Sequence, residues 1–279
     1  MGESMIQHNS VELNGIRFHY AESPGEGPTL VLLIGFNDSI ETYLPIMPDL
    51  ATIAHVYAFE FRGHGESGHT PNQYTMQNHV HDVEQFLQTI TDTPVILAGH
   101  SMGGGVAGWT TARNGEWVKG LIVEDANLLW SDDVDDGSPE FIPVRDQITA
   151  FKASGKSFEE FAEQIAQSPA SSVYEGKTRL EVYGKEGAYR HARQRWAMDV
   201  THYDSIIDGT VSQGYVASAI VPLIRCPTCF ITSNQWTPTK DLQAIPGAVH
   251  VTINTADHRV HEVCPTEFTQ AVKSFIATI

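Results

Sequence analysis

Apolar runs alternate with amphipathic segments along the first half of the chain. Continuous apolar or strand-like runs occupy residues 29–34, 55–61, 94–98 and 121–123. Such uninterrupted runs are typical of parallel strands that are buried on both faces. Between two of them, residues 75–90 place apolar side chains near helical spacing. The alternation predicts a parallel sheet covered by helices on both faces.

The two ends of the chain add elements of the same architecture. An Asn-Gly pair divides two β-rich runs within residues 11–21 and predicts a hairpin. Strand character returns at residues 228–232 and 249–254, and residues 267–276 fit a closing helix. We therefore expect the sheet to be completed by the last third of the chain.

The middle of the chain has a different pattern. Residues 128–218 contain no strand-like run and read as helical, and Ser157 with Glu160 forms a capping-box signature before an amphipathic segment. This pattern predicts a helical cap of residues 128–218, inserted between two core segments, residues 1–127 and 219–279. A cap in this place would cover a pocket.

Composition narrows the classes of partner. The chain has 279 residues and a formal net charge of −17. This charge disfavours nucleic acid and anionic membranes, which select basic surfaces, and it favours a neutral or cationic small-molecule substrate. The first ten residues lack the basic and apolar regions of a signal peptide, so we expect a cytoplasmic protein. The sequence is compatible with a homodimer.

Residues 226–229 read CPTC, a spacing seen in metal and redox sites. No second pair accompanies them, and they lie beside a strand-like run, so we expect buried free thiols and no metal site.

A serine lies at a predicted strand-to-helix turn. Residues 99–103 read GHSMG, which fits the G-x-S-x-G pattern, after an apolar run and before a helix-like segment. Small neighbours allow the sharp turn that lifts a serine hydroxyl above the sheet. The same turn brings the Met102 amide close to charge that develops on a substrate oxygen. Ser101 is therefore the expected nucleophile.

The serine needs a base, and the chain has 13 histidines. His258 follows the last predicted strand and precedes the closing helix, where a loop returns over the carboxyl edge of the sheet. His261 is the competing candidate. His100 adjoins Ser101 in sequence, but neighbours at this turn diverge, so it is expected to be structural.

Together these motifs resemble the α/β-hydrolase superfamily. The resemblance covers nearly the whole chain and is carried by Gly35-Phe36, residues 61–67 (FRGHGES), residues 99–104, residues 226–228, and His258 followed by Pro265. It implies a mostly parallel, eight-stranded sheet flanked by helices, with a helical cap, and an enzyme that uses no cofactor. The motifs are specific for the superfamily and not for a substrate.

The triad acid departs from the common pattern. The segment of residues 232–237, where many members carry it, has Trp236 at the acid position, and Asp241 lies too far along. Consecutive side chains of a strand point to opposite faces, so only one of Glu124 and Asp125 could reach the base. The sequence resembles haloalkane dehalogenases and zearalenone-type lactone hydrolases at this strand, which implies Asp125 as the acid.

The loop after residues 29–34 is the expected oxyanion loop. Ile34 replaces the histidine that many members have there, but the donors are backbone amides, those of Phe36 and Met102. Asn37 could donate from its side chain or cap the next helix.

Aromatic residues in and near the cap could line the pocket. Trp130, Trp196 and Trp236 are the expected substrate contacts, although packing between cap and core would use the same residue types.

Three functions remain open from the sequence. The first is hydrolysis of an ester or lactone of a neutral, bulky or aromatic small molecule, through an acyl-enzyme on Ser101. The second rests on a resemblance to cofactor-free dioxygenases that cleave 3-hydroxy-4-oxoquinoline rings. The third is a non-catalytic ligand receptor. One fold hosts many chemistries, so the fold cannot separate them.

Overall fold

A computed structural model describes residues 6–129 and 137–279. Its eight-stranded sheet has the strand order β1-β2-β4-β3-β5-β6-β7-β8. The strands are β1 (Gln7–Leu13), β2 (Ile16–Ser23), β3 (Thr29–Leu33), β4 (His55–Phe59), β5 (Val95–His100), β6 (Val118–Glu124), β7 (Thr228–Thr232) and β8 (Val249–Thr252). From β4 to β8 the neighbouring strands are parallel, whereas β2 is antiparallel to both β1 and β4. The predicted α/β-hydrolase sheet is confirmed.

The hairpin of β1 and β2 forms where the Asn-Gly pair predicted it. Asn14 and Gly15 have φ angles of 53° and 76°, as a two-residue turn of the I′ type requires. The register pairs Leu13 with Ile16 directly across this turn.

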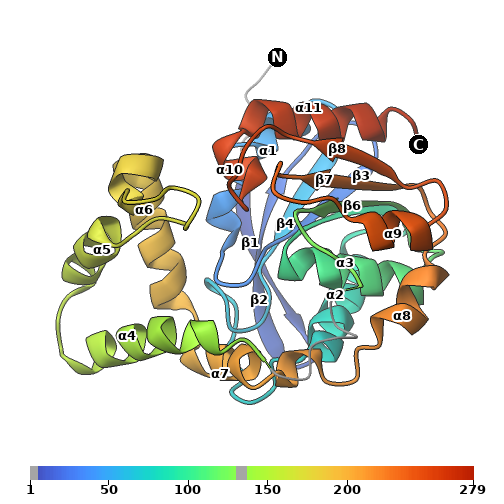
Figure 1. Cartoon of the computed structure of the whole chain (residues 1–279). Coiled ribbons are helices and arrows are strands. Elements are labelled where there is room, and N and C mark those ends of the chain that lie inside the picture. The colour runs from blue at the N-terminus through green and yellow to red at the C-terminus, as the bar shows by residue number, and fades with distance from the viewer. Residues whose placement is uncertain (1–5, 130–136) are drawn as a thin grey trace.

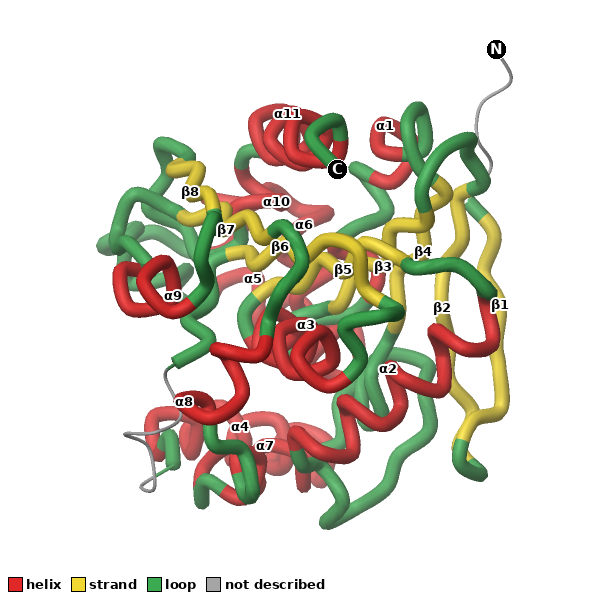
Figure 2. Tube along the Cα trace, turned by 90° about the vertical axis from the view of Figure 1, so that its right-hand side faces the viewer, coloured by secondary structure: helices red, strands yellow, loops and turns green. Residues whose placement is uncertain are grey.

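Helices cover both faces of the sheet (Figure 2). One face carries α1 (Met47–Leu50), α10 (Val260–Val263) and α11 (Pro265–Ile276), and the other carries α2 (Met76–Ile90), α3 (Met102–Arg113) and α8 (Ala217–Ile220). A short helix, α9 (Thr239–Ala244), follows β7. The strands of the sheet interior are buried along nearly their whole length, so β3, β5 and β6 form the centre of the core.

Four helices between β6 and β7 lie where the helical cap is expected and are called the cap below; they project from one side of the core (Figure 1). They are α4 (Ile142–Ala153), α5 (Phe158–Gln167), α6 (Arg179–Ala197) and α7 (Val200–Ile207). The predicted capping box of Ser157 and Glu160 begins α5. A second box, of Thr178 and Glu181, begins α6, and α6 is kinked at Gly184, whose φ is 66°.

Buried apolar side chains form two clusters, one in the sheet core and a smaller one within the cap. Of the cysteines, Cys229 is buried as expected, whereas Cys226 and Cys264 are partly exposed. Within the described residues, no helix combines the length and apolarity that crossing a membrane requires.

Candidate active site

Ser101 occupies the turn between β5 and α3, with φ 51° and ψ −120°. These angles are unfavourable for a residue with a Cβ, and such strain persists only where the surroundings enforce it. Glycines make the turn possible here. A Cβ on Gly99 would overlap the backbone of Gly103, and one on Gly103 would overlap the carbonyls at the end of β3. The hydroxyl is thereby presented at the carboxyl edge of the sheet.

His258 and Asp125 meet at the same edge. His258, on the loop after β8, has its Nδ1 2.7 Å from Oδ2 of Asp125, which follows β6 directly. The Asp125 side chain is 4% exposed, whereas that of His258 is 49% exposed. A carboxylate on Nδ1 holds the imidazole in the tautomer that leaves Nε2 free to accept a proton. This is the arrangement of an oriented general base.

The ionised form of Asp125 is stabilised by its neighbours. Burial would raise the pKa of its carboxyl, but hydrogen bonds from His258 and from the Ser233 amide lower it below the ordinary value. Oδ1 accepts from the Ser233 N–H at 2.7 Å and from the Trp236 indole Nε1–H at 3.1 Å. Trp236 therefore contacts the expected acid, and it is not among the residues that line the cavity at Ser101.

The competing acid and base bind each other. His261 Nδ1 lies 2.7 Å from Glu124 Oε1, and its Nε2 lies 2.6 Å from the Thr42 hydroxyl. All three side chains are buried. Asp241 is buried elsewhere, where it accepts hydrogen bonds from the amides of Leu128 and Leu129. The geometry thus leaves Asp125 as the carboxylate on His258.

His100 is buried beneath the base, as expected for a structural residue. Its Nε2–H donates to the backbone carbonyl of His258 at 3.0 Å, and its Nδ1 faces Asp38 Oδ2 at 3.4 Å. Sequence reasoning missed Asp38, which also binds the guanidinium of Arg259. No local pattern marks this carboxylate, because its partners are distant in sequence.

The residues of the expected oxyanion donors line the same cavity as Ser101. Phe36 follows β3, and Met102 is the first residue of α3, where an amide has no partner within the helix. Among the described residues, neither amide N–H donates a hydrogen bond to the protein. Both are therefore free to bind a substrate oxygen.

Asn37 has a different role from helix capping. Ser39 caps the next helical turn, so the capping interpretation of Asn37 is wrong. Its Oδ1 accepts a 2.6 Å hydrogen bond from the Tyr203 hydroxyl of the cap. Asn37 thus joins the oxyanion loop to α7, and Tyr203 is a second residue that the sequence analysis missed in this role.

A cavity of about 290 Å³ opens at Ser101. Its lining is mostly apolar and comprises Phe36, Met76, Ser101, Met102, Asp125, Ala126, Asn127, Ser138, Phe141, Ile206 and Val211. The structure does not bring Trp196 here, because α6 turns its ring toward Phe158 and Phe161 inside the cap. Trp130 lies outside the described residues.

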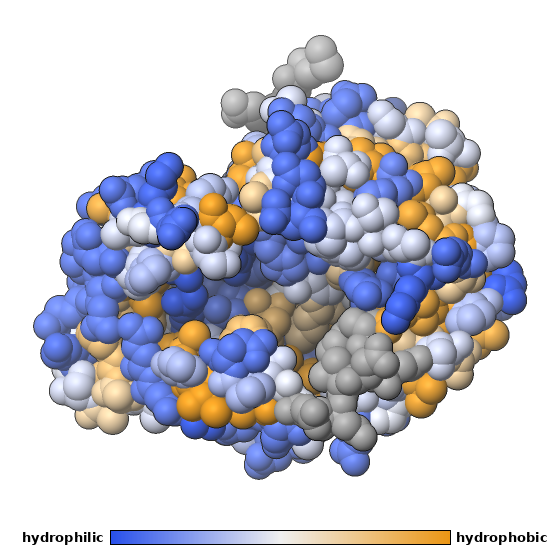
Figure 3. Space-filling view, viewed as in Figure 1, coloured by the Kyte–Doolittle hydropathy of each residue, from blue (hydrophilic) through white to orange (hydrophobic). Residues whose placement is uncertain are grey.

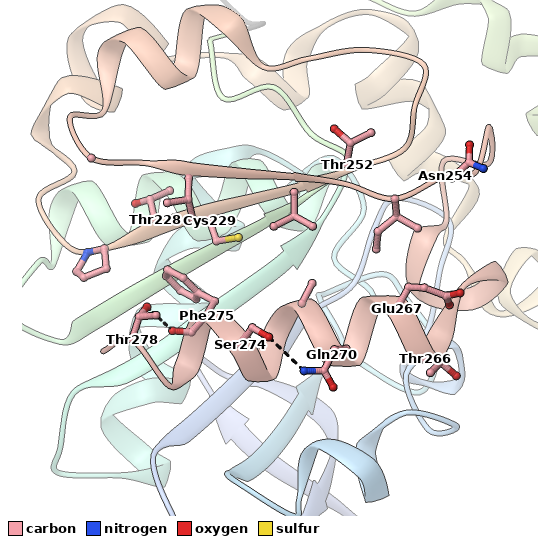
Figure 4. A pocket seen from close by; sticks show the side chains of 16 residues that line it. Thr228, Cys229, Thr252, Asn254, Thr266, Glu267, Gln270, Ser274, Phe275 and Thr278 are labelled. Atoms are coloured by element: carbon pink, nitrogen blue, oxygen red, sulfur yellow. Dashed lines mark hydrogen bonds between the residues drawn. The ribbon is translucent and has the colours of Figure 1, made fainter.

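A larger groove, of about 820 Å³, lies between β8 and α11 (Figure 4). None of the triad candidates lines it, and its ionisable residues are Cys229 and Glu267. Burial raises the pKa of the Cys229 thiol to about 12, so this group is protonated at neutral pH. Its lining therefore offers no activated nucleophile, and the smaller cavity is the candidate active site.

No group of three or more His, Cys, Asp or Glu side chains in the described ranges, residues 6–129 and 137–279, could hold a metal ion.

Solved structures share this fold across the chain. A deformylase of N-formylmaleamic acid from Pseudomonas putida S16 has a TM-score of 0.77 at 17% identity, covering 95% of this chain and 100% of its own. An enol-lactonase from Burkholderia xenovorans LB400 has a TM-score of 0.72 at 22% identity, covering 96% of this chain and 100% of its own. At these identities the likeness shows the fold alone.

Curated relatives match the chain in part. A soluble epoxide hydrolase of Corynebacterium sp. is 31% identical over 120 residues, which are 43% of this chain and 42% of that protein. The (E)-2-((N-methylformamido)methylene)succinate hydrolase of Acinetobacter baylyi is 31% identical over 105 residues, which are 38% and 40% of the two chains. The match thus spans less than half of either relative.

The family model described as "alpha/beta hydrolase fold" matches residues 28–186. This segment is more than half of the chain and contains Ser101, Asp125 and the oxyanion loop. The chain belongs to the alpha/beta hydrolase fold family, and its relatives include hydrolases of several bond types.

Proposed function

We propose that this protein is a serine hydrolase that cleaves an ester or a lactone of a small molecule with a bulky apolar portion. Ser101 attacks the acyl carbonyl while His258 accepts the hydroxyl proton, and Asp125 stabilises the imidazolium that forms. His258 then returns the proton to the leaving alcohol. In a second half-reaction, His258 deprotonates water, which attacks the acyl-enzyme and restores Ser101.

One observation carries this proposal. The 2.7 Å contact between His258 Nδ1 and Asp125 Oδ2 fixes a base beside a cavity that Ser101 lines. The free amides of Phe36 and Met102 support acyl transfer, because a tetrahedral intermediate needs donors for its oxyanion. Each such donor contributes roughly 3 kcal/mol in enzymes where it has been removed.

The apolar lining of the cavity supports a substrate with a bulky apolar portion. Phe36, Phe141 and Ile206 provide apolar walls around a volume of about 290 Å³, which is at the small end of the range for ligand pockets. An aryl or branched acyl or alcohol group would fill it and bury the apolar surface of these side chains.

Hydrolysis of 4-nitrophenyl esters by the purified protein tests the proposal. We expect turnover by the native protein, its loss in Ser101→Ala, and a covalent adduct of a fluorophosphonate at Ser101 in peptide mass spectra. Absence of both turnover and adduct would refute acyl transfer. Oxygen consumption with a 3-hydroxy-4-oxoquinoline, retained in Ser101→Ala, would establish the dioxygenase reaction in its place.

A further inference from the structure

Three arginines lie near enough to influence one another's charge. Arg179 and Arg195 come from the two segments of α6 that the kink at Gly184 separates, and Arg259 follows the proposed base His258. Only Arg259 is paired, with Asp38 Oδ1 lying 3.2 Å from its Nε and 3.1 Å from its Nη2. Among the described residues, the guanidinium groups of Arg179 and Arg195 have no ion pair, and Arg179 Nε is buried without a hydrogen-bond partner.

These guanidinium groups repel one another. Burial, together with the charges of Arg195 and Arg259, lowers the pKa of Arg179 to about 9. Burial and the charge of Arg259 likewise lower the pKa of Arg195, against the opposing influence of Tyr203 and Asp38. Unpaired cations that are held together and partly removed from water raise the free energy of the unliganded protein. An anion bound between them would relieve this cost.

The carboxylates near these arginines already bind other groups. Asp38 binds Arg259, Glu262 binds Arg190 and His191, and Asp257 accepts hydrogen bonds from Tyr183 and the Arg259 amide. The guanidinium groups of this region, those of Arg179, Arg190, Arg195 and Arg259, thus outnumber its carboxylates, Asp38, Asp257 and Glu262. A local excess of positive charge is unexpected in a chain of net charge −17.

The arginines are linked to the loops of the proposed reaction centre, although they do not line the cavity at Ser101 itself. The charges of all three lower the pKa of the Tyr203 phenol against the effect of burial, and the Tyr203 hydroxyl donates a hydrogen bond to Asn37 of the oxyanion loop. Arg259 joins the base loop to the oxyanion loop through Asp38. Figure 3 shows a hollow between the cap and the core, with hydrophilic and apolar residues on its walls.

We propose that Arg195 and Arg179 bind a carboxylate of the substrate, so that the scissile ester or lactone belongs to an organic acid. This inference rests on the proposed hydrolase function and names its substrate class. A guanidinium group matches a carboxylate with two parallel hydrogen bonds, which the unpaired donors of these residues can supply. The net charge of the chain determines its long-range electrostatic field, and this field favours a neutral substrate. Recognition within the cleft depends on the charges that lie there, and these favour an anion.

A matched pair of substrates tests the inference. 4-Nitrophenyl hydrogen glutarate carries a free carboxylate, and 4-nitrophenyl pentanoate is a neutral counterpart of similar length. We expect the native protein to have the higher kcat/KM for the acidic ester. In Arg195→Gln or Arg179→Gln, the ratio of the two kcat/KM values is expected to fall roughly 10- to 100-fold, as the loss of a charged hydrogen bond predicts.

The control is Arg193→Gln, on the same helix. Its guanidinium group is already paired with Glu41 and Glu186, so the ratio of the two esters should stay the same. Glutarate should inhibit competitively, and this inhibition should weaken in Arg195→Gln. Inhibition by inorganic phosphate without inhibition by glutarate would overturn the assignment of a carboxylate.

The two proposals fail in different ways. A native protein that hydrolyses both esters with equal kcat/KM would refute the carboxylate site and leave the serine hydrolase intact. A protein that hydrolyses neither ester and forms no adduct at Ser101 would refute the hydrolase itself.

Discussion

Glu124 and Asp125 are consecutive in the chain, and their carboxylates bind two different histidines. Glu124 lies 2.7 Å from His261 Nδ1, and Asp125 lies 2.7 Å from His258 Nδ1. The first pair is buried, whereas His258 is half exposed at the candidate site. Neighbouring carboxylates thus form one pair suited to stability and one suited to catalysis, and the two can be separated by mutation.

Asp125→Asn should lower kcat by about 10³- to 10⁴-fold. The new side-chain amide has a single oxygen, which can still accept hydrogen bonds from Ser233 and Trp236. Its NH₂ group then faces His258 Nδ1. This nitrogen must accept a hydrogen bond, so the imidazole adopts the tautomer that cannot serve as the base. Steady-state kinetics with a 4-nitrophenyl ester measures the loss. Asp241→Asn is the comparison, since Asp241 accepts hydrogen bonds from the amides of Leu128 and Leu129 and not from His258. Equal turnover in the two variants would refute Asp125 as the acid.

Glu124→Gln should act chiefly on stability. Breaking a buried ion pair while leaving one partner costs about 3–5 kcal/mol, so urea denaturation at pH 6 should show a loss of this order in the free energy of unfolding. The expected loss in kcat of the remaining folded protein is far smaller than that of Asp125→Asn.

The same variant should show a pH-dependent difference from the native protein. Burial lowers the pKa of His261, but Glu124 outweighs it and raises that pKa above 6.5. The contribution of the pair is therefore present below pH 6.5 and is lost as pH rises through the raised pKa. The native-minus-variant difference in unfolding free energy should shrink between about pH 6 and 9. A constant difference would show that His261 is not ionised in the folded protein.

Trp236→Phe should weaken catalysis less than Asp125→Asn does. It removes the indole donor to Asp125 Oδ1, 3.1 Å away, and keeps an aromatic ring in its place. A hydrogen bond to a charged group contributes about 1.5–3 kcal/mol, so kcat/KM should fall by roughly 10- to 100-fold. Because the acid loses a donor, the pKa of Asp125 should rise, which nuclear magnetic resonance of the carboxyl carbon can report. An unchanged Asp125 pKa would contradict this role.

Ser101→Gly should be more stable than Ser101→Ala. Ser101 has φ 51° and ψ −120°, and glycine adopts positive φ without the steric cost of a Cβ. Neither variant has a nucleophile, so both should be inactive. The urea midpoint should be higher for the glycine variant, by the equivalent of about 1 kcal/mol or more. If the alanine variant is the more stable one, the turn is not strained.

Local patterns determined much of this protein. Apolar runs located the strands, because a strand buried on both faces must be apolar throughout, and the Asn-Gly pair located the hairpin. The G-x-S-x-G turn placed Ser101, since its glycines are required by contacts within a few residues. Thr178 and Glu181 carry the same capping-box signal at the start of α6 as Ser157 and Glu160 carry at the start of α5.

Partners that are distant in sequence were decided only by the tertiary structure. Trp236 is predicted to contact substrate, but the loop after β7 places its indole against Asp125. Trp196 packs inside the cap, because helix packing determines which face of α6 is turned inward. Glu124 and Asp125 could be separated only when the sheet showed which histidine each meets. The sequence determined which elements and reactive groups exist, because those depend on neighbours in the chain. Which groups share a cavity, and where unpaired arginines accumulate, depends on contacts between segments that are not neighbours in the chain.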